Sequence, residues 1–231
     1  MKNILNNMRN SLPRYVIIQP STGKKVTFRP FTVKEEKYLM MAKNTGSYED
    51  FLCTLANIIN SCFDITLDAK KLPLFDIEYF FLKIRSKSIN EIVEPTIVCP
   101  VTKEKIKVTI NLEEIEPTEK INNFKLNISD GIIVNMKYPS LENLIQNNEG
   151  DVYDFAIDCI DSIETINEKI ENTNTDRKEF LEFIELMTTD QFLKILNFIK
   201  TIPKIEKNIL YKTSDGIERT LKLKGLKDFF Q

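Results

Sequence analysis

Few side chains in this chain could carry covalent or metal chemistry. Its 231 residues include no histidine and only four cysteines. Without an imidazole there is no His-based acid or base, no Ser-His-Asp or Cys-His pair, and no histidine ligand for zinc or iron. The cysteines are dispersed and too few to cross-link a chain of this length, so we expect reduced, buried thiols in a cytosolic compartment. The sequence therefore predicts a protein that is not an enzyme and that has no catalytic residues, metal or cofactor.

Two patterns still deserve a test as metal ligands. Cys99-Pro-Val-Thr102 lies at a predicted hairpin turn, where a zinc ribbon would have a second cysteine in place of Thr102. The carboxylates of Asp151, Asp154, Asp158 and Asp161 recur at helical spacing, and such an acidic stripe could ligate Mg²⁺ or Ca²⁺. The same spacing is typical of the solvated side of an amphipathic helix, which we favour.

The charge balance argues against a protein that wraps nucleic acid. There are 32 Lys and Arg against 34 Asp and Glu, which gives a net charge of −2. Lysines do gather on the predicted hairpins, but aromatic residues are not interleaved with them for base stacking, and lysine also protects sheet edges from unwanted pairing. A nucleic-acid-associated accessory protein that uses these lysines is the alternative hypothesis. The lysines concerned are Lys24, Lys25, Lys103, Lys105, Lys107, Lys222, Lys224 and Lys227.

The elements that position these residues alternate between β-hairpins and helices, which predicts an α+β fold. We expect the first element at Tyr15, in a hairpin over 15–28, followed by a helix capped by Thr32 and Glu35 with an apolar face that includes Val33, Tyr38 and Met41. Ser47 starts the next helix and Pro73 a third, with one buried side. Extended chain then forms a second hairpin over 95–112.

The second half of the chain repeats this order after an acidic linker, Glu113–Asn123. We expect a hairpin over 124–136, a helical region from Ser140 to Ile170 interrupted at 147–150, and two helices over 177–185 and 188–200. A final hairpin turns at Ser214-Asp-Gly216 and leads into a terminal helical turn.

The two halves share register as well as order. Gly131 follows Gly23 by 108 positions, and the same offset pairs Val26 with Val134. This predicts two similar lobes, 1–116 and 117–231, that arose by duplication and that could pack together as one domain. The alternative is that hairpins followed by capped helices look alike wherever they occur.

Three segments together resemble a known family. Lys25-Val-Thr-Phe-Arg-Pro-Phe-Thr-Val-Lys-Glu-Glu-Lys37, the hairpin around Cys99, and Leu223-Lys-Gly-Leu-Lys-Asp-Phe-Phe230 are similar to elements of the baseplate hub assembly proteins of T-even-type contractile-tail bacteriophages. Some members of that family carry cysteine pairs at the hairpin turns, but here Cys99 stands alone. The resemblance implies a structural or assembly protein of the tail baseplate hub that binds other tail proteins. It would act in the host cytoplasm during assembly, and the two alternatives are that it remains in the virion tail or that it acts only transiently as an assembly factor.

A protein that works by contact needs apolar anchors ringed by polar groups. Arg29, Pro30 and Phe31 lie between a predicted strand end and a capped helix, and three further candidates lie at the end of the chain: Leu226, Phe229 and Phe230. The alternative for these rings is that they fill the ends of the core. A membrane partner is not expected, because no apolar run approaches the roughly 20 residues that span a bilayer.

Overall fold

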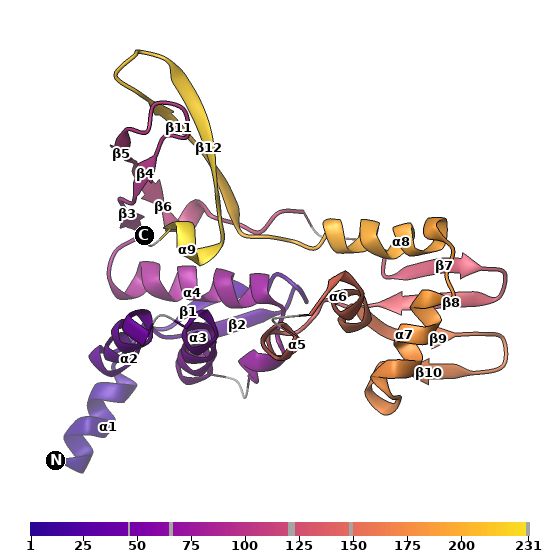
Figure 1. Ribbon diagram of the computed structural model, residues 1–231. Helices are drawn as coiled ribbons and strands as arrows, with labels where there is room; N and C mark the ends of the chain where they lie inside the picture. The colour runs from indigo at the N-terminus through magenta and orange to yellow at the C-terminus, as the bar shows by residue number, and fades with distance from the viewer. Residues whose placement is uncertain (46, 65–66, 120–122, 148–149, 230–231) are drawn as a thin grey trace. The chain divides into compact units, whose positions relative to one another are not determined.

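The protein consists of two compact units formed by discontinuous stretches of chain. The computed structural model describes residues 1–45, 47–64, 67–119, 123–147 and 150–229, apart from the side chains of Lys2, Asn6, Arg9 and Thr45. Unit 1 comprises residues 1–69, 75–118 and 204–231, and unit 2 comprises residues 70–74 and 119–203. Helices and small antiparallel sheets occur in both, so the expected α+β class is confirmed (Figure 1).

These units differ from the lobes expected at 1–116 and 117–231. The chain leaves unit 1 at Thr118, within the predicted linker, but residues 204–231 rejoin unit 1. Two contacts hold the start of this returning segment. Thr118 and Lys204 exchange hydrogen bonds, and Pro117 forms a β-bridge with Ile205. An origin by duplication stays a prediction.

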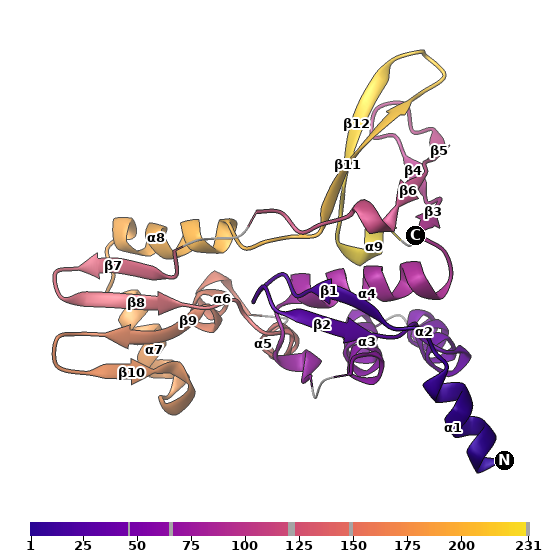
Figure 2. The same cartoon turned by 180° about the vertical axis from the view of Figure 1, so that it is seen from behind.

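Unit 1 combines helices with short antiparallel strand pairs, β1–β2, β3–β6, β4–β5 and β11–β12. In Figures 1 and 2 its segments are those in indigo and purple together with the yellow C-terminal hairpin. Its elements are α1 (Lys2–Asn10), β1 (Tyr15–Ile18), β2 (Lys25–Phe28), α2 (Val33–Thr45), α3 (Tyr48–Cys62), α4 (Leu74–Ser88), β3 (Ile92–Val93), β4 (Thr96–Val98), β5 (Lys105–Lys107), β6 (Ile110–Asn111), β11 (Glu206–Lys212), β12 (Glu218–Lys224) and α9 (Gly225–Phe229), with a 3₁₀ turn at Leu112–Glu114. A further 3₁₀ turn, Ala69–Lys71, begins at the last residue of the first stretch of unit 1 and continues into unit 2.

Helix α4 is the centre of unit 1. The sequence predicts one buried side for it, but its residues from Phe75 to Ile84 are buried all round. The ring of Phe80 lies 4.5 Å from that of Phe63, which in turn lies 5.7 Å from Phe28 on β2, so an aromatic row joins the helix to the first hairpin. Within the described residues, no helix is both long and apolar enough to cross a bilayer.

A helix buried on every side must find partners for its charged side chains, because an unpaired buried charge is costly. Asp76 accepts hydrogen bonds from Gln19 Nε2 at 2.7 Å and from the backbone N–H of Ser21 at 2.9 Å. Both donors lie between β1 and β2. The carboxylate of Asp76 therefore fastens the turn of the first hairpin to the start of α4.

The other two buried charges of α4 bind two further segments. Lys83 donates to the carbonyl oxygen of Glu113 at 2.7 Å and to Glu116 at 3.1 Å, where the chain is about to leave unit 1. Glu78 accepts the N–H of Leu226, in α9, at 3.3 Å. Each of these three buried charges thus holds a different outer segment in place.

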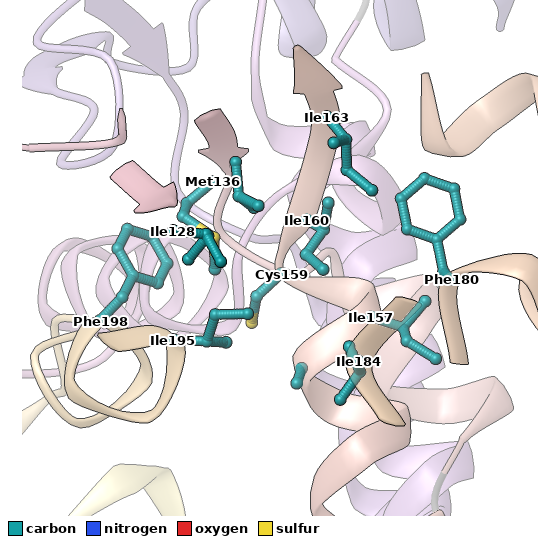
Figure 3. Packing of buried hydrophobic residues seen from close by; sticks show 12 residues of the cluster. Ile128, Met136, Ile157, Cys159, Ile160, Ile163, Phe180, Ile184, Ile195 and Phe198 are labelled. Atoms are coloured by element: carbon teal, nitrogen blue, oxygen red, sulfur yellow. The ribbon is translucent and has the colours of Figure 1, made fainter. Parts of the chain in front are cut away.

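Unit 2 is a four-stranded antiparallel sheet, in the order β10-β9-β8-β7, packed on helices. Its elements are β7 (Lys125–Ser129), β8 (Ile132–Met136), α5 (Leu141–Gln146), α6 (Val152–Asp158), β9 (Ile160–Glu164), β10 (Lys169–Glu171), α7 (Arg177–Glu185) and α8 (Thr189–Lys200), with a 3₁₀ turn at Asn172–Asn174. Figure 3 shows the core, in which Met136 of β8 and Ile160 and Ile163 of β9 meet side chains of α6, α7 and α8. Val134 of β8 belongs to the same cluster.

Two sequence predictions about secondary structure are wrong. The helical region expected to reach Ile170 ends at Asp158, because Ile160 and Ile163 are buried by pairing β9 with β8, a contact that local spacing does not reveal. The first element is α1 and not the hairpin at Tyr15. This segment is rich in asparagine, which is why its composition does not indicate a helix. Its apolar residues nevertheless have the helical spacing i, i+3, i+4 and i+7, at Met1, Ile4, Leu5 and Met8.

Gly225 is required by both its backbone and its neighbour. Its φ is +63°, and a Cβ at this position would lie 2.8 Å from Oε1 of Glu78. Gly216 has a similar φ of +77°, but a Cβ added there would meet no atom within 4 Å.

We therefore expect Gly225→Ala to destabilise the protein more than Gly216→Ala. The positive φ costs about 1–2 kcal/mol at either site, and displacing the buried Glu78 adds on the order of 1 kcal/mol at Gly225. Urea unfolding of the two variants measures the difference. An equal loss of unfolding free energy in the two variants would show that the closeness of Glu78 to Gly225 does not restrict the residue at position 225.

Candidate docking surface

An apolar groove of about 920 Å³ lies within unit 1. Helices α2, α3 and α4 form most of it, the segment around β3 closes one part, and α9 supplies another wall. The large apolar side chains that line it are Phe31, Leu39, Met40, Tyr48, Phe51, Phe81, Ile89, Val93, Leu226 and Phe229.

The groove exists because α2 carries more apolar side chains than unit 1 buries. Ala42 and Leu39 pack inward or half inward, whereas Val33, Tyr38 and Met41, which the sequence places on a core-facing side, are exposed. Met40 is 60% exposed and lines the groove, and Met41 is 56% exposed and lines a second hollow between α2 and α3. Apolar side chains on two faces of one helix indicate that α2 is a surface for contact.

Three of the residues predicted to bind a partner are brought together here. Phe31 follows β2 and is held by the hydrogen bond that its N–H donates to Ser88 Oγ, at 2.9 Å. Leu226 and Phe229 lie on α9 and are nearly fully buried, at 4% and 1% exposure. All three contribute to the groove wall, and the two on α9 also fill the edge of the core.

Arg29 and Pro30, which the sequence also predicts to bind a partner, are not part of the groove lining. Arg29 forms a two-pronged ion pair with Glu35, at 2.6 and 3.1 Å, and donates to the carbonyl oxygen of Ser61 at 2.9 Å. Glu35 also accepts the N–H of Thr32 at 2.6 Å, as expected of a capping pair. Arg29 therefore ties β2 to α2 and α3, and Pro30 is half-buried beside it. Phe230 lies outside the described residues.

The edge of the groove carries both acidic and basic side chains. Glu36 and Glu94 line it together with Lys43, Arg85 and Lys227. The edge therefore carries one more basic than acidic residue.

Behind α9, burial raises the pKa of Glu78 to about 7, although the N–H of Leu226 works in the opposite direction. We therefore expect the carboxyl of Glu78, at its contact with α9, to change its protonation state near neutral pH.

Sequence reasoning missed the residues that form the floor and the opposite wall of the groove, including Met40, Tyr48 and Phe51. The signal was present in α2, where Tyr38, Leu39, Met40 and Met41 follow one another and point in different directions around a helix. Such a run exceeds what one core-facing stripe needs.

Cys99 lies in a hydrogen-bonded turn and not beside another cysteine. Its sulfur accepts the N–H of Thr102 and the hydroxyl of Tyr211, both at 3.4 Å, and is fully buried. Burial opposes ionisation, but these hydrogen bonds lower the pKa of the thiol. The contact joins the β4–β5 turn to β11, and the bonds that Ser214 donates to Glu104 reinforce it.

The acidic stripe expected on one helix face is divided. Asp151 caps α6, Asp154 and Asp158 bind the guanidinium of Arg177 at 3.0 and 2.7 Å, and Asp161 lies on β9. Among the residues that the structure describes, no three His, Cys, Asp or Glu side chains form a group that could hold a metal ion.

Part of the hairpin lysine set is engaged with carboxylates. Lys107 pairs with Glu94 at 2.5 Å and Lys222 with Glu206 at 2.8 Å. These pairs reduce the positive charge that the hairpins present.

A comparison with known protein families identifies the family of this chain. Residues 12–231 match the family described as T4 bacteriophage base plate protein. The chain belongs to this family. It is therefore a structural protein of a phage tail baseplate, as its resemblance to T-even-type baseplate proteins implies. No curated protein and no solved structure matches the chain.

For this baseplate protein, we expect Glu78→Gln to change the pH dependence of stability. A carboxyl whose pKa is raised by folding stabilises the native state most at low pH and loses that contribution as pH rises through about 7. The glutamine keeps an oxygen for the N–H of Leu226 and removes the buried charge.

The variant should therefore match the wild type at pH 5 and exceed its stability at pH 8, by on the order of 2 kcal/mol. Chemical denaturation at both pH values measures this. A difference between the two proteins that is the same at pH 5 and pH 8 would contradict it.

Proposed function

We propose that this baseplate protein builds the central hub of the tail baseplate, through protein–protein contacts and without catalysis. The unit 1 groove is its docking surface, and the occupant is an apolar segment of another hub protein. The protein acts in the host cytoplasm during assembly and is carried into the virion tail.

The observation that carries this proposal is the groove itself, with aromatic walls held on a rigid frame. Phe31, Tyr48 and Phe51 line it with rings that are at least partly exposed. The N–H of Phe31 donates a hydrogen bond to Ser88 and the N–H of Leu226 donates one to Glu78, and these bonds fix the segment of Phe31 and the α9 wall. Aromatic side chains that are already ordered lose little entropy when a partner packs on them, which makes them effective anchors.

The distribution of exposed apolar side chains points to the same region. Isolated exposed apolar residues are ordinary, but several on neighbouring elements mark a contact surface. In the described part of unit 1, such residues follow one another on α2 and the start of α3: Val33, Tyr38, Met40, Met41 and Tyr48.

Two adjacent methionines allow a matched test of the groove. We expect Met40→Glu to lower binding to the hub partner at least about tenfold, because it places a charge in an apolar contact. Met41→Glu makes the same chemical change at similar exposure but faces the second hollow, and should change affinity less than about threefold. The measurement is affinity for each purified hub protein of the same phage, paired with plaque formation when each variant replaces the wild type during infection.

Equal effects of the two substitutions would contradict docking in the groove. A protein that binds no hub protein but shifts single- or double-stranded DNA at low salt, with loss on replacing the hairpin lysines, would favour the nucleic-acid alternative. Melting temperatures of both variants near the wild-type value show that the fold is intact.

A further inference from the structure

Helix α1 is an amphipathic helix whose apolar side lies open to solvent. Met1, Ile4, Leu5 and Met8 are 88, 59, 48 and 63% exposed, although their spacing places them along one side of the helix. The opposite side carries asparagines, of which Asn3, Asn7 and Asn10 are exposed. In Figures 1 and 2, α1 extends away from α2 and α3.

This helix is short and lies outside the part of the chain that defines the family. It spans nine residues, and helices of this length are marginally stable in water unless they pack on something. The family match begins at residue 12, after α1 has ended, so the shared properties of the family do not account for it. A nine-residue helix with an unpaired apolar stripe is suited to binding in a groove through its i, i+3, i+4 and i+7 side chains.

Charge indicates what kind of groove fits. The first fourteen residues contain Lys2, Arg9 and Arg14 and no Asp or Glu. Lys2 and Arg9 belong to the helix, whereas Arg14 follows it and is paired with Asp64 in unit 1. A complementary surface is therefore apolar along its floor and acidic along its rim.

We propose that α1 is a second docking element, which inserts its apolar side into an acidic-rimmed groove on another baseplate protein. The groove of a second copy of this chain fits less well, because basic residues outnumber acidic ones along its edge. A lipid surface also fits less well, because membrane-surface helices carry Lys and Arg across the polar face and Trp or Phe on the other, whereas α1 has asparagines and aliphatic side chains. The proposal relies on the proposed function for its class of partner, but not on the unit 1 groove.

The test uses the full-length chain and two double variants with the same change of charge. Ile4→Asp/Met8→Asp alters the apolar side, and Asn3→Asp/Asn7→Asp alters the opposite side. The probes are the purified baseplate proteins of the same phage, the unlabelled wild-type chain, and vesicles of equal parts phosphatidylglycerol and phosphatidylcholine. Affinities are measured at low and at physiological salt.

We expect at least one baseplate protein to bind the wild type, with affinity lowered at least about tenfold by Ile4→Asp/Met8→Asp and less than about threefold by Asn3→Asp/Asn7→Asp. Affinity should rise at low salt, as attraction to an acidic rim requires. Loss of that binding in Met40→Glu but not in Ile4→Asp/Met8→Asp would support the unit 1 groove and overturn the role of α1. Equal effects of the two double variants, binding only to vesicles or to a second copy, or no binding to any baseplate protein would also overturn it.

Discussion

Unit 1 depends on the requirement that a charged side chain buried in protein must have a partner. Helix α4 is buried all round, yet Asp76, Glu78 and Lys83 are among its buried side chains. Each of these three charges therefore needs a hydrogen-bond partner from outside the helix. The partners come from the β1–β2 turn, from α9, and from the segment after β6. Removing one partner would leave a charge in the core, and therefore these contacts specify where three otherwise unrelated segments lie.

The same constraint explains why the groove is well formed. Its α9 wall is attached through Glu78, and its α4 wall is the central helix itself. Another wall, α2, is fixed at its start by Arg29 and Glu35. Rigid walls with exposed apolar side chains suit a protein whose work is contact, and they agree with membership of a structural baseplate family. The apolar side chains of α1, by contrast, are exposed to solvent.

Local signals in the sequence predict the local structure well. Ser47 and Thr188 cap helices as expected, the hairpins over 15–28 and 124–136 form, and Gly225–Phe229 is helical. Non-local pairing is what the sequence does not reveal. Ile160 and Ile163 look helical until β8 is available to bury them. The return of residues 204–231 to unit 1 rests on contacts such as Tyr211 with Cys99, more than a hundred positions apart. Phe31, Leu226 and Phe229 could be proposed as contact residues, but their common groove could not, because it depends on that return.

The discontinuous path of unit 1 also has a consequence for how the protein is made. A ribosome synthesises β1 to β6 first, then the whole of unit 2, and only afterwards the segment with β11, β12 and α9. Until that segment emerges, Glu78 has no N–H from Leu226 and the groove has no second wall. Nascent chains and prematurely terminated fragments therefore lack the finished groove.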